Sequence, residues 1–266
     1  MHDRRRNTHK ANSVGHGAVR TAVVFGCLFF VVATGAAMFD YPGGTHLDPG
    51  TEGYDFFDNT FSELGRIEGY LGQEKRLSFV LFLAAMVVAG VALVAFFAVE
   101  ASDAKAAGGG RIATKSAVVL GAVTGMGFAG IGLTPTDVIP RIHYFFVYAA
   151  FSAYVPATVA LFAAWRTAAP ADDSRRRIRL RTYGAFFVVL AVYLVFISVS
   201  ATAEPRTVHL LLTSGQKIIV YVALGVVAFV SADDVRRRSY GGRAACAAAP
   251  GAPAESAPTR TSARGR

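Results

Sequence analysis

The sequence is poor in the residues that a disulfide-bonded, metal-binding or ordinary soluble protein relies on. Its only two cysteines are Cys27, in the first long apolar run, and Cys246, in the C-terminal segment, so we expect no disulfide and no redox or metal role for either. Charged residues make up 17% of the chain, whereas hydrophobic residues make up 53%. This composition argues against a soluble domain.

The scarce charges are also absent from most of the long apolar runs. About 20 mainly apolar residues are needed for a helix to cross a bilayer. Six runs meet this requirement: 21–39, 77–98, 116–133, 142–164, 183–201 and 208–230. Only the last run contains an ionisable Asp, Glu, Lys or Arg, and that residue is Lys217. The sequence therefore predicts an all-α integral membrane protein, a six-transmembrane-helix bundle over residues 21–230, with disordered cytoplasmic tails at 1–20 and 231–266.

The distribution of charge predicts the orientation of the bundle. If alternate gaps face opposite sides, the side of the N-terminus holds 21 basic and 8 acidic residues, and the other side holds 6 basic and 10 acidic residues. This asymmetry follows the positive-inside rule and predicts a plasma-membrane protein with both termini in the cytoplasm. We expect membrane lipids as partners and no nucleic acid, because no aromatic and basic patch accompanies the net charge of +9. An uncleaved first helix is favoured over a cleaved signal peptide, since its apolar run is long.

The longest polar connection, residues 40–76, contains the stretch around which the polar chemistry is organised. Phe57, Phe61 and Leu64 have helical spacing, and Thr60 and Glu63 have the spacing of a capping box. The pattern predicts a short interfacial helix that lies over the outer mouth of the bundle. An ordered loop anchored by its phenylalanines is the alternative.

Lys217 is the most informative single residue, because a lysine within a spanning helix costs a few kcal/mol in plain lipid. Its side chain should lean toward the helix N-terminus, which is the outer side. His209, Thr213 and Gln216 form a polar stripe beside it. Either Lys217 reaches the interface or makes a single hydrogen-bonded contact, or it is a buried counter-charge for a carboxylate or an anionic ligand.

We expect the outer-side polar groups to converge on one polar vestibule beneath the loop. The predicted ligand-binding residues are Asn59, Ser62, Glu63, Asp137, His143, His209, Gln216 and Lys217. His143, His209 and Asp137 are weak candidates for a metal site, because no HExxH or similarly tight ligand spacing is present. Ser62 lacks the motif of a nucleophile elbow. We expect no cofactor.

Small residues recur at helical spacing in the third apolar run, at Gly121, Gly125 and Ala129. Such a face lets two helix backbones approach closely. Tight packing within the bundle is the favoured interpretation, and a homo-oligomer contact is the alternative.

Two short motifs carry a resemblance to a known family. The first is Asn59-Thr-Phe-Ser62-Glu63-Leu64-Gly65, and the second is Gly132-Leu-Thr-Pro135-Thr-Asp137 followed by His143. Over about residues 20–230 the chain resembles the uncharacterised prokaryotic multi-pass membrane family known as domain of unknown function 998. The resemblance implies a six-helix membrane fold and no particular reaction.

Three functions are compatible with these features. Binding of a lipid or small amphiphile in an outward-facing vestibule is favoured. A membrane-embedded hydrolase, with or without a metal, is the first alternative. A small transporter with Lys217 as the coupling charge is the second, and it is less favoured because the helices carry few polar groups toward the inner side.

Overall fold

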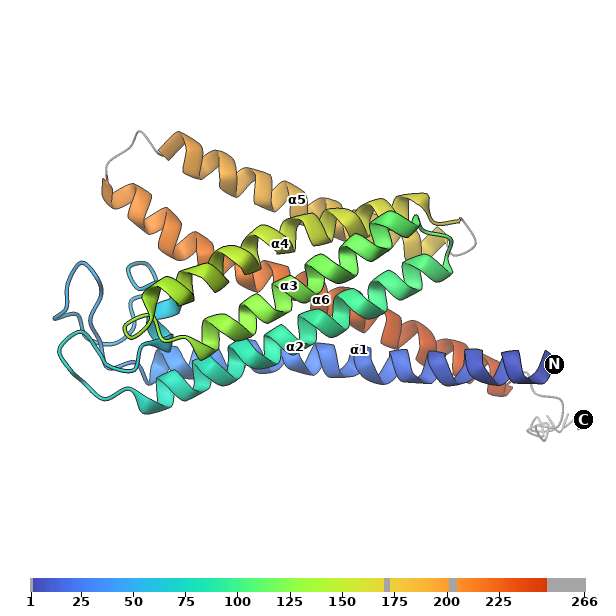
Figure 1. Ribbon diagram of the computed structural model, residues 1–266, viewed down its shortest axis with the longest axis horizontal. Helices are drawn as coiled ribbons and strands as arrows, with labels where there is room; N and C mark the ends of the chain where they lie inside the picture. The colour runs from blue at the N-terminus through green and yellow to red at the C-terminus, as the bar shows by residue number, and fades with distance from the viewer. Residues whose placement is uncertain (1, 170–172, 201–204, 248–266) are drawn as a thin grey trace, which may run out of the picture.

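The structure, a computed structural model, describes residues 2–169, 173–200 and 205–247 (Figure 1). These residues form six long α-helices and one short 3-10 helix. The elements are α1 (His2–Phe39), η1 (Phe61–Gly65), α2 (Arg76–Ala106), α3 (Arg111–Leu133), α4 (Pro140–Thr167), α5 (Asp173–Ser200) and α6 (Pro205–Ala247). All six α-helices are long and apolar enough to cross a membrane. The protein is therefore a polytopic, all-α membrane protein, as the sequence predicts.

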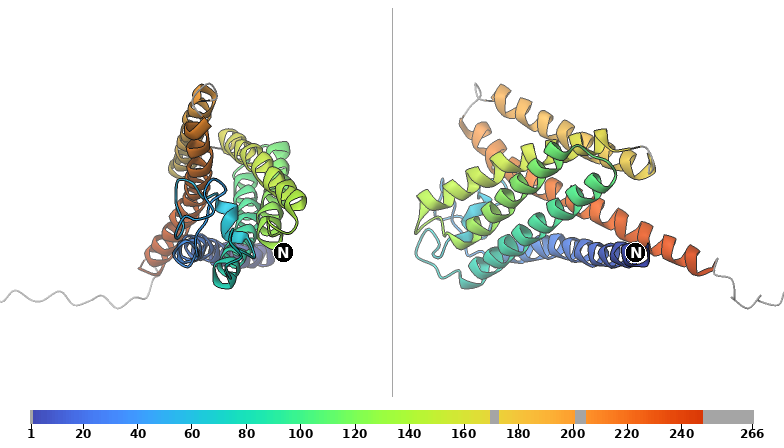
Figure 2. Two further views of the ribbon diagram at one scale, coloured as in Figure 1. Left: turned by 90° about the vertical axis from the view of Figure 1, so that its left-hand side faces the viewer. Right: turned by 45° about the vertical axis from the view of Figure 1, so that its right-hand side comes forward.

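The helices run up and down along one common direction, so that the bundle has two distinct ends. Residues 40–75 and η1 lie at one end, which we call the loop end, and the start of α1 and the end of α6 lie at the other, which we call the terminal end (Figure 1). α1 packs against α2 and α6, and α3 packs between α2 and α4. α5 stands at the edge of the bundle, and its outermost part diverges from α4 toward the loop end (Figure 2). The spanning segment of α5 is the least buried of the six.

The first and last helices extend beyond the apolar runs that identify them. α1 begins at His2, where the sequence predicts a disordered tail, and α6 continues from residue 230 to Ala247. Just beyond the two apolar runs, Arg20 of α1 and Asp234 of α6 are both buried and form an ion pair of 2.8 Å, so the two helices pack together there. The predicted disorder of residues 248–266 lies outside the described residues.

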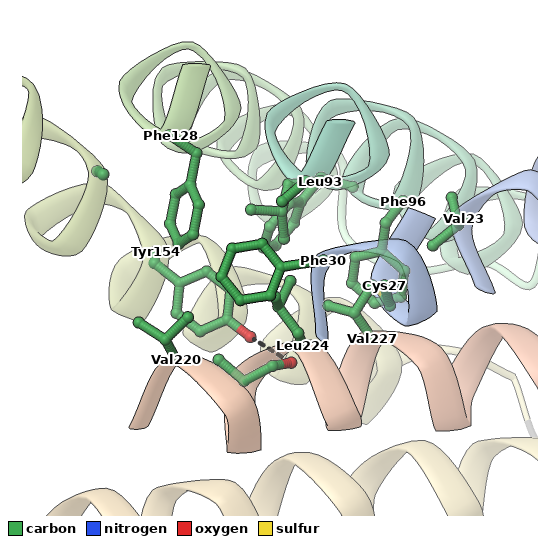
Figure 3. Close-up of a cluster of buried hydrophobic side chains, with 14 of the residues drawn as sticks. Val23, Cys27, Phe30, Leu93, Phe96, Phe128, Tyr154, Val220, Leu224 and Val227 are labelled. Atoms are coloured by element: carbon green, nitrogen blue, oxygen red, sulfur yellow. Dashed lines mark hydrogen bonds between the residues drawn. The ribbon is translucent and has the colours of Figure 1, made fainter. Parts of the chain in front are cut away.

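The centre of the bundle is an apolar core to which all six α-helices contribute. Phe30 of α1, Leu93 of α2, Phe128 of α3 and Tyr154 of α4 converge on α6 (Figure 3). The hydroxyl of Tyr154 donates a hydrogen bond of 3.2 Å to the backbone carbonyl of Ala223 in α6. A tyrosine buried at this depth thus has its polar atom satisfied, which is the usual condition for burying one.

The small residues of α3 allow it to pack closely against its neighbours within the same chain. A Cβ atom at Gly121 would collide with the ring of Phe97, and one at Gly125 would collide with the backbone carbonyl of Gly90. The side chain of Ala129 also lies against Gly90. The face formed by Gly121, Gly125 and Ala129 is therefore occupied by α2, as the bundle-packing interpretation requires. The alternative, a homo-oligomer contact through Gly121, Gly125 and Ala129, stays a prediction.

Candidate functional site

η1 is inserted into the loop end of the bundle. Its residues Phe61 and Leu64 are buried, and the ring centroid of Phe61 lies 5.8 Å from that of Phe30 and 5.6 Å from that of Tyr221. The predicted interfacial helix is therefore a five-residue 3-10 turn that begins at Phe61. Phe57, which was expected to share its buried face, is 60% exposed. Because η1 is wedged between α1, α2 and α6, it holds its neighbouring polar residues in fixed positions.

Asn59 and Glu63 organise the loop above η1. The side-chain amide of Asn59 donates hydrogen bonds to the backbone carbonyl of Gly44 (2.8 Å) and to Glu63 (3.0 Å). Glu63 also accepts a hydrogen bond of 2.5 Å from the backbone N–H of Thr60. This is the bond that a capping box requires of its glutamate, as the sequence predicts. Gly44 has a φ of +88°, a conformation that favours glycine. These two predicted site residues are therefore buried and bonded to the loop itself.

A second buried lysine, Lys75, supports the same loop from below. Its ammonium group donates to the backbone carbonyls of Glu63 (2.5 Å) and Leu64 (3.3 Å) and lies 4.5 Å from the ring centroid of Tyr41. Burial, together with the nearby charge of Arg66, lowers the pKa of Lys75 to about 7. Sequence reasoning did not single out this residue, because a lysine just before a spanning helix is usually at the interface.

Lys217 has the same kind of environment on the other side of the loop. The side chain is fully buried, and its ammonium group donates to the backbone carbonyl of Asn59. The nitrogen lies 4.9 Å from the ring centroid of Phe56 and 5.5 Å from that of Tyr54. Its partners are therefore a carbonyl and two aromatic rings. The structure therefore agrees with the interpretation that Lys217 makes a single hydrogen-bonded contact, here with the carbonyl of Asn59.

Ser62 and His143 form the one side-chain pair that joins the two motifs. The Oγ of Ser62 lies 2.9 Å from the Nε2 of His143, and the Nδ1 of His143 lies 2.6 Å from the carbonyl oxygen of Thr134. Because a carbonyl oxygen can only accept, Nδ1 carries the proton and Nε2 accepts the hydrogen bond of the serine hydroxyl. His143 is fully buried at the start of α4. The pair is separated by 81 residues in the sequence, so residue spacing gave no signal for it.

Asp137 and His209 have separate partners in the loop. The carboxylate of Asp137 accepts the backbone N–H groups of Ile67 (3.0 Å) and Glu68 (3.1 Å). The Nε2 of His209 lies 3.2 Å from the backbone carbonyl of Asp58. The three weak candidates for a metal site, Asp137, His143 and His209, thus have different hydrogen-bond partners. Within the described part of the chain, no group of three His, Cys, Asp or Glu side chains is arranged to hold a metal ion.

Beneath η1 lies an apolar cavity of about 430 Å³ between α4, α5 and α6, which we call the lateral cavity. It extends from the loop to the middle of the bundle. Its lining residues are Thr60, Leu93, Phe128, Val147, Phe151, Tyr154, Val155, Phe186, Leu190, Tyr193, Leu212, Thr213, Gln216, Ile219, Val220, Ala223 and Leu224. Leu212 is 49% exposed, so the cavity reaches the lipid-facing surface. Of the predicted site residues only Gln216 lines the lateral cavity, whose walls are mainly apolar.

A second buried polar cluster lies at the terminal end, and the sequence analysis missed it. We call it the ion cluster, and its members are Arg20, Glu100, Asp103, Arg175, Arg179, Asp233 and Asp234. Glu100 is fully buried and accepts hydrogen bonds from Arg20 (2.6 Å), Arg179 (3.0 Å) and the indole N–H of Trp165 (2.9 Å). Each member lies just outside or at the edge of an apolar run, where charges normally face water. The expectation that the helices carry few polar groups toward the inner side, which counted against a transporter, is therefore incorrect. The members of the ion cluster are, however, paired with one another.

No protein-family model, no curated protein and no solved structure matches the chain.

Proposed function

We propose that this membrane protein binds a lipid or small amphiphile in the lateral cavity. The observation that carries the proposal is the cavity itself. Its volume of about 430 Å³ falls within the range of small-molecule sites, and its walls are mainly aliphatic and aromatic. Because the cavity reaches the lipid-facing surface beside Leu212, an amphiphile has a path into it from the bilayer.

Apart from the hydroxyl of Tyr154, which is bonded to the Ala223 carbonyl, polar side chains of the cavity lie at its loop end, and this suits a molecule with one polar end. Thr60, Thr213 and Gln216 lie there, whereas Phe186 and Leu224 line the part near the middle of the bundle. The hydroxyl of Thr213 is bonded to the backbone carbonyl of Phe57. The side-chain amide of Gln216 makes no hydrogen bond to another described residue and is available to a ligand. An acyl chain would therefore lie along the apolar part with its polar end beside Gln216.

The test is to identify what the protein retains when it is purified. Full-length protein is extracted in a mild detergent, and its bound lipids are measured by native mass spectrometry. Val220→Trp fills the cavity, and Val119→Trp is the matched control on the exposed face of α3. We expect about one retained molecule per chain in the wild type and in the control, and none in Val220→Trp.

A second variant keeps the test decisive if tryptophan at residue 220 disturbs folding. Gln216→Leu leaves the space open but removes the free amide, so the retained species should change in its polar end. Equal retention of the same lipids in all four proteins would show that only surface lipid is bound and would refute the proposal.

We also propose that the terminal end faces the cytoplasm and that the loop end faces the outside of the plasma membrane. The excess of basic residues on the side of the termini supports this orientation. The resemblance to domain of unknown function 998 stays a proposal as well. It is supported by the contact between its two motifs, since Ser62 of the first is bonded to His143 of the second.

A further inference from the structure

The environment of Ser62 has the arrangement that activates a serine hydroxyl as a nucleophile. A nucleophilic serine needs a base within hydrogen-bonding distance, and the base needs a third group that orients it. Nε2 of His143 lies 2.9 Å from Oγ of Ser62, and the carbonyl of Thr134 fixes the other ring nitrogen at 2.6 Å. The imidazole is therefore held as the tautomer that can accept the serine proton.

Ser62 also lies next to the space in which the amphiphile is proposed to bind. It lines a small cavity of about 20 Å³, which is large enough for one water molecule. This small cavity shares the residues Phe128, Val147, Phe151, Gln216 and Val220 with the lateral cavity. The two cavities thus adjoin, and Gln216 lies at both.

We propose that Ser62 is the nucleophile of an acyl-transfer reaction on the ester of a lipid or amphiphile, with His143 as general base and general acid. This inference rests on the proposed function, because the lateral cavity supplies the acyl-chain site. The ligand class becomes a carboxylic ester whose acyl chain lies in the lateral cavity and whose carbonyl lies beside Ser62.

The reaction has two balanced halves. In the first, Oγ of Ser62 attacks the ester carbonyl carbon while its proton passes to Nε2 of His143. The carbon–oxygen bond to the alcohol then breaks, and Nε2 returns the proton to the leaving alkoxide. In the second half, water gives its proton to Nε2 and attacks the acyl-serine. The acid is released, and Ser62 recovers its proton from Nε2.

Gln216 is the group placed to stabilise the negative charge that develops on the carbonyl oxygen. Its amide carries two N–H donors and makes no hydrogen bond to another described residue. A side-chain amide serves this purpose in other acyl-transfer sites, and removal of one such donor costs about 10²–10³-fold in rate. Phe151 lines both the small cavity and the lateral cavity, as Gln216 does.

The experiment is covalent labelling of the full-length protein in lipid nanodiscs with a long-chain alkyl fluorophosphonate. The phosphorus is attacked as the ester carbon would be, and fluoride leaves. We expect the wild type to be labelled at Ser62, as identified by peptide mass spectrometry. Ser62→Ala should take no label, His143→Gln should be labelled at least about 100-fold more slowly, and the exposed-serine control Ser198→Ala should behave as the wild type.

Further outcomes separate this inference from the binding proposal. A wild type that retains its amphiphile but takes no label overturns the nucleophile and leaves binding intact. Label at Ser62 in a protein that retains no amphiphile supports the nucleophile and overturns the binding proposal. Ser62→Cys guards against misfolding as the cause of lost label, because a folded variant should lose fluorophosphonate reactivity and react instead with an alkyl maleimide in a manner that depends on His143. An unreactive cysteine in a protein with unchanged thermal stability would refute the activated site.

Discussion

Removal of the charge of Glu100 should strongly destabilise the bundle. Glu100 is fully buried and accepts hydrogen bonds from Arg20 at 2.6 Å and Arg179 at 3.0 Å. Glu100→Gln preserves the size of the side chain but leaves the two guanidinium groups with less negative charge around them. Loss of one partner of a buried ion pair typically costs about 3–5 kcal/mol. At about 2–4 °C per kcal/mol for a chain of this size, we expect the unfolding temperature to fall by roughly 6–20 °C.

The measurement is thermal unfolding of detergent-solubilised protein followed by intrinsic fluorescence. Glu74→Gln is the matched control, because Glu74 and Arg76 form a pair of 3.4 Å whose side chains are 79% and 85% exposed. A surface pair of this kind contributes about 0–1 kcal/mol, so the control should unfold close to the wild type. If Glu100→Gln also unfolds within about 2 °C of the wild type, the ion cluster does not stabilise the fold and the reasoning fails.

Three further predictions concern α3 and the two buried lysines. Gly125→Ala should lower thermal stability by about 1–3 kcal/mol, since the added methyl meets the backbone of Gly90, whereas Gly184→Ala, which meets nothing within 4 Å, should not. The pKa of Lys75 is lowered to about 7 in the folded protein, whereas an unfolded lysine keeps its proton to about pH 10.5. The free energy of unfolding of the wild type, measured relative to Lys75→Met by denaturant titration, should therefore rise between about pH 7 and 10.5 by at most about 1.4 kcal/mol per pH unit. A difference that does not change with pH would contradict this. Lys217→Met should speed hydrogen exchange of residues 54–60, by loss of the bond to Asn59, and Ile218→Met should not.

The fold could be predicted from the sequence because its signal is local. The lengths of the apolar runs identify the spanning helices, and the small residues at Gly121 and Gly125 mark the face of α3 that packs closely. The extents of α1 and α6 could not be predicted in this way. Beyond each apolar run, the first charged groups, Arg20 of α1 and Asp234 of α6, are buried against each other. The sequence around each of these residues does not distinguish such a buried charge from a solvated one.

The contacts of the candidate site could not be predicted from local sequence either. The predicted polar residues lie at the loop end, but most of them are bonded to the loop itself. Asn59 and Asp137 are bonded to loop backbone, and only Gln216 lines the lateral cavity. Phe61 packs against Phe82 of α2, and η1 lies between α1, α2 and α6. This packing places Ser62 within hydrogen-bonding distance of His143 at the start of α4, a pairing that no spacing along the chain indicates.

The two polar clusters explain why an apolar cavity can persist between α4, α5 and α6. At the terminal end α5 is fixed by Arg175 and Arg179, which bind Asp103, Asp233 and Asp234. Toward the loop end α5 is largely exposed, so that half of the helix gains little from closing onto α4. A helix that is anchored by charge at one end need not fill its other end with packed side chains in order to stay in place. The ion cluster therefore stabilises the bundle at a distance from the cavity, and it leaves the space beside η1 available for a ligand.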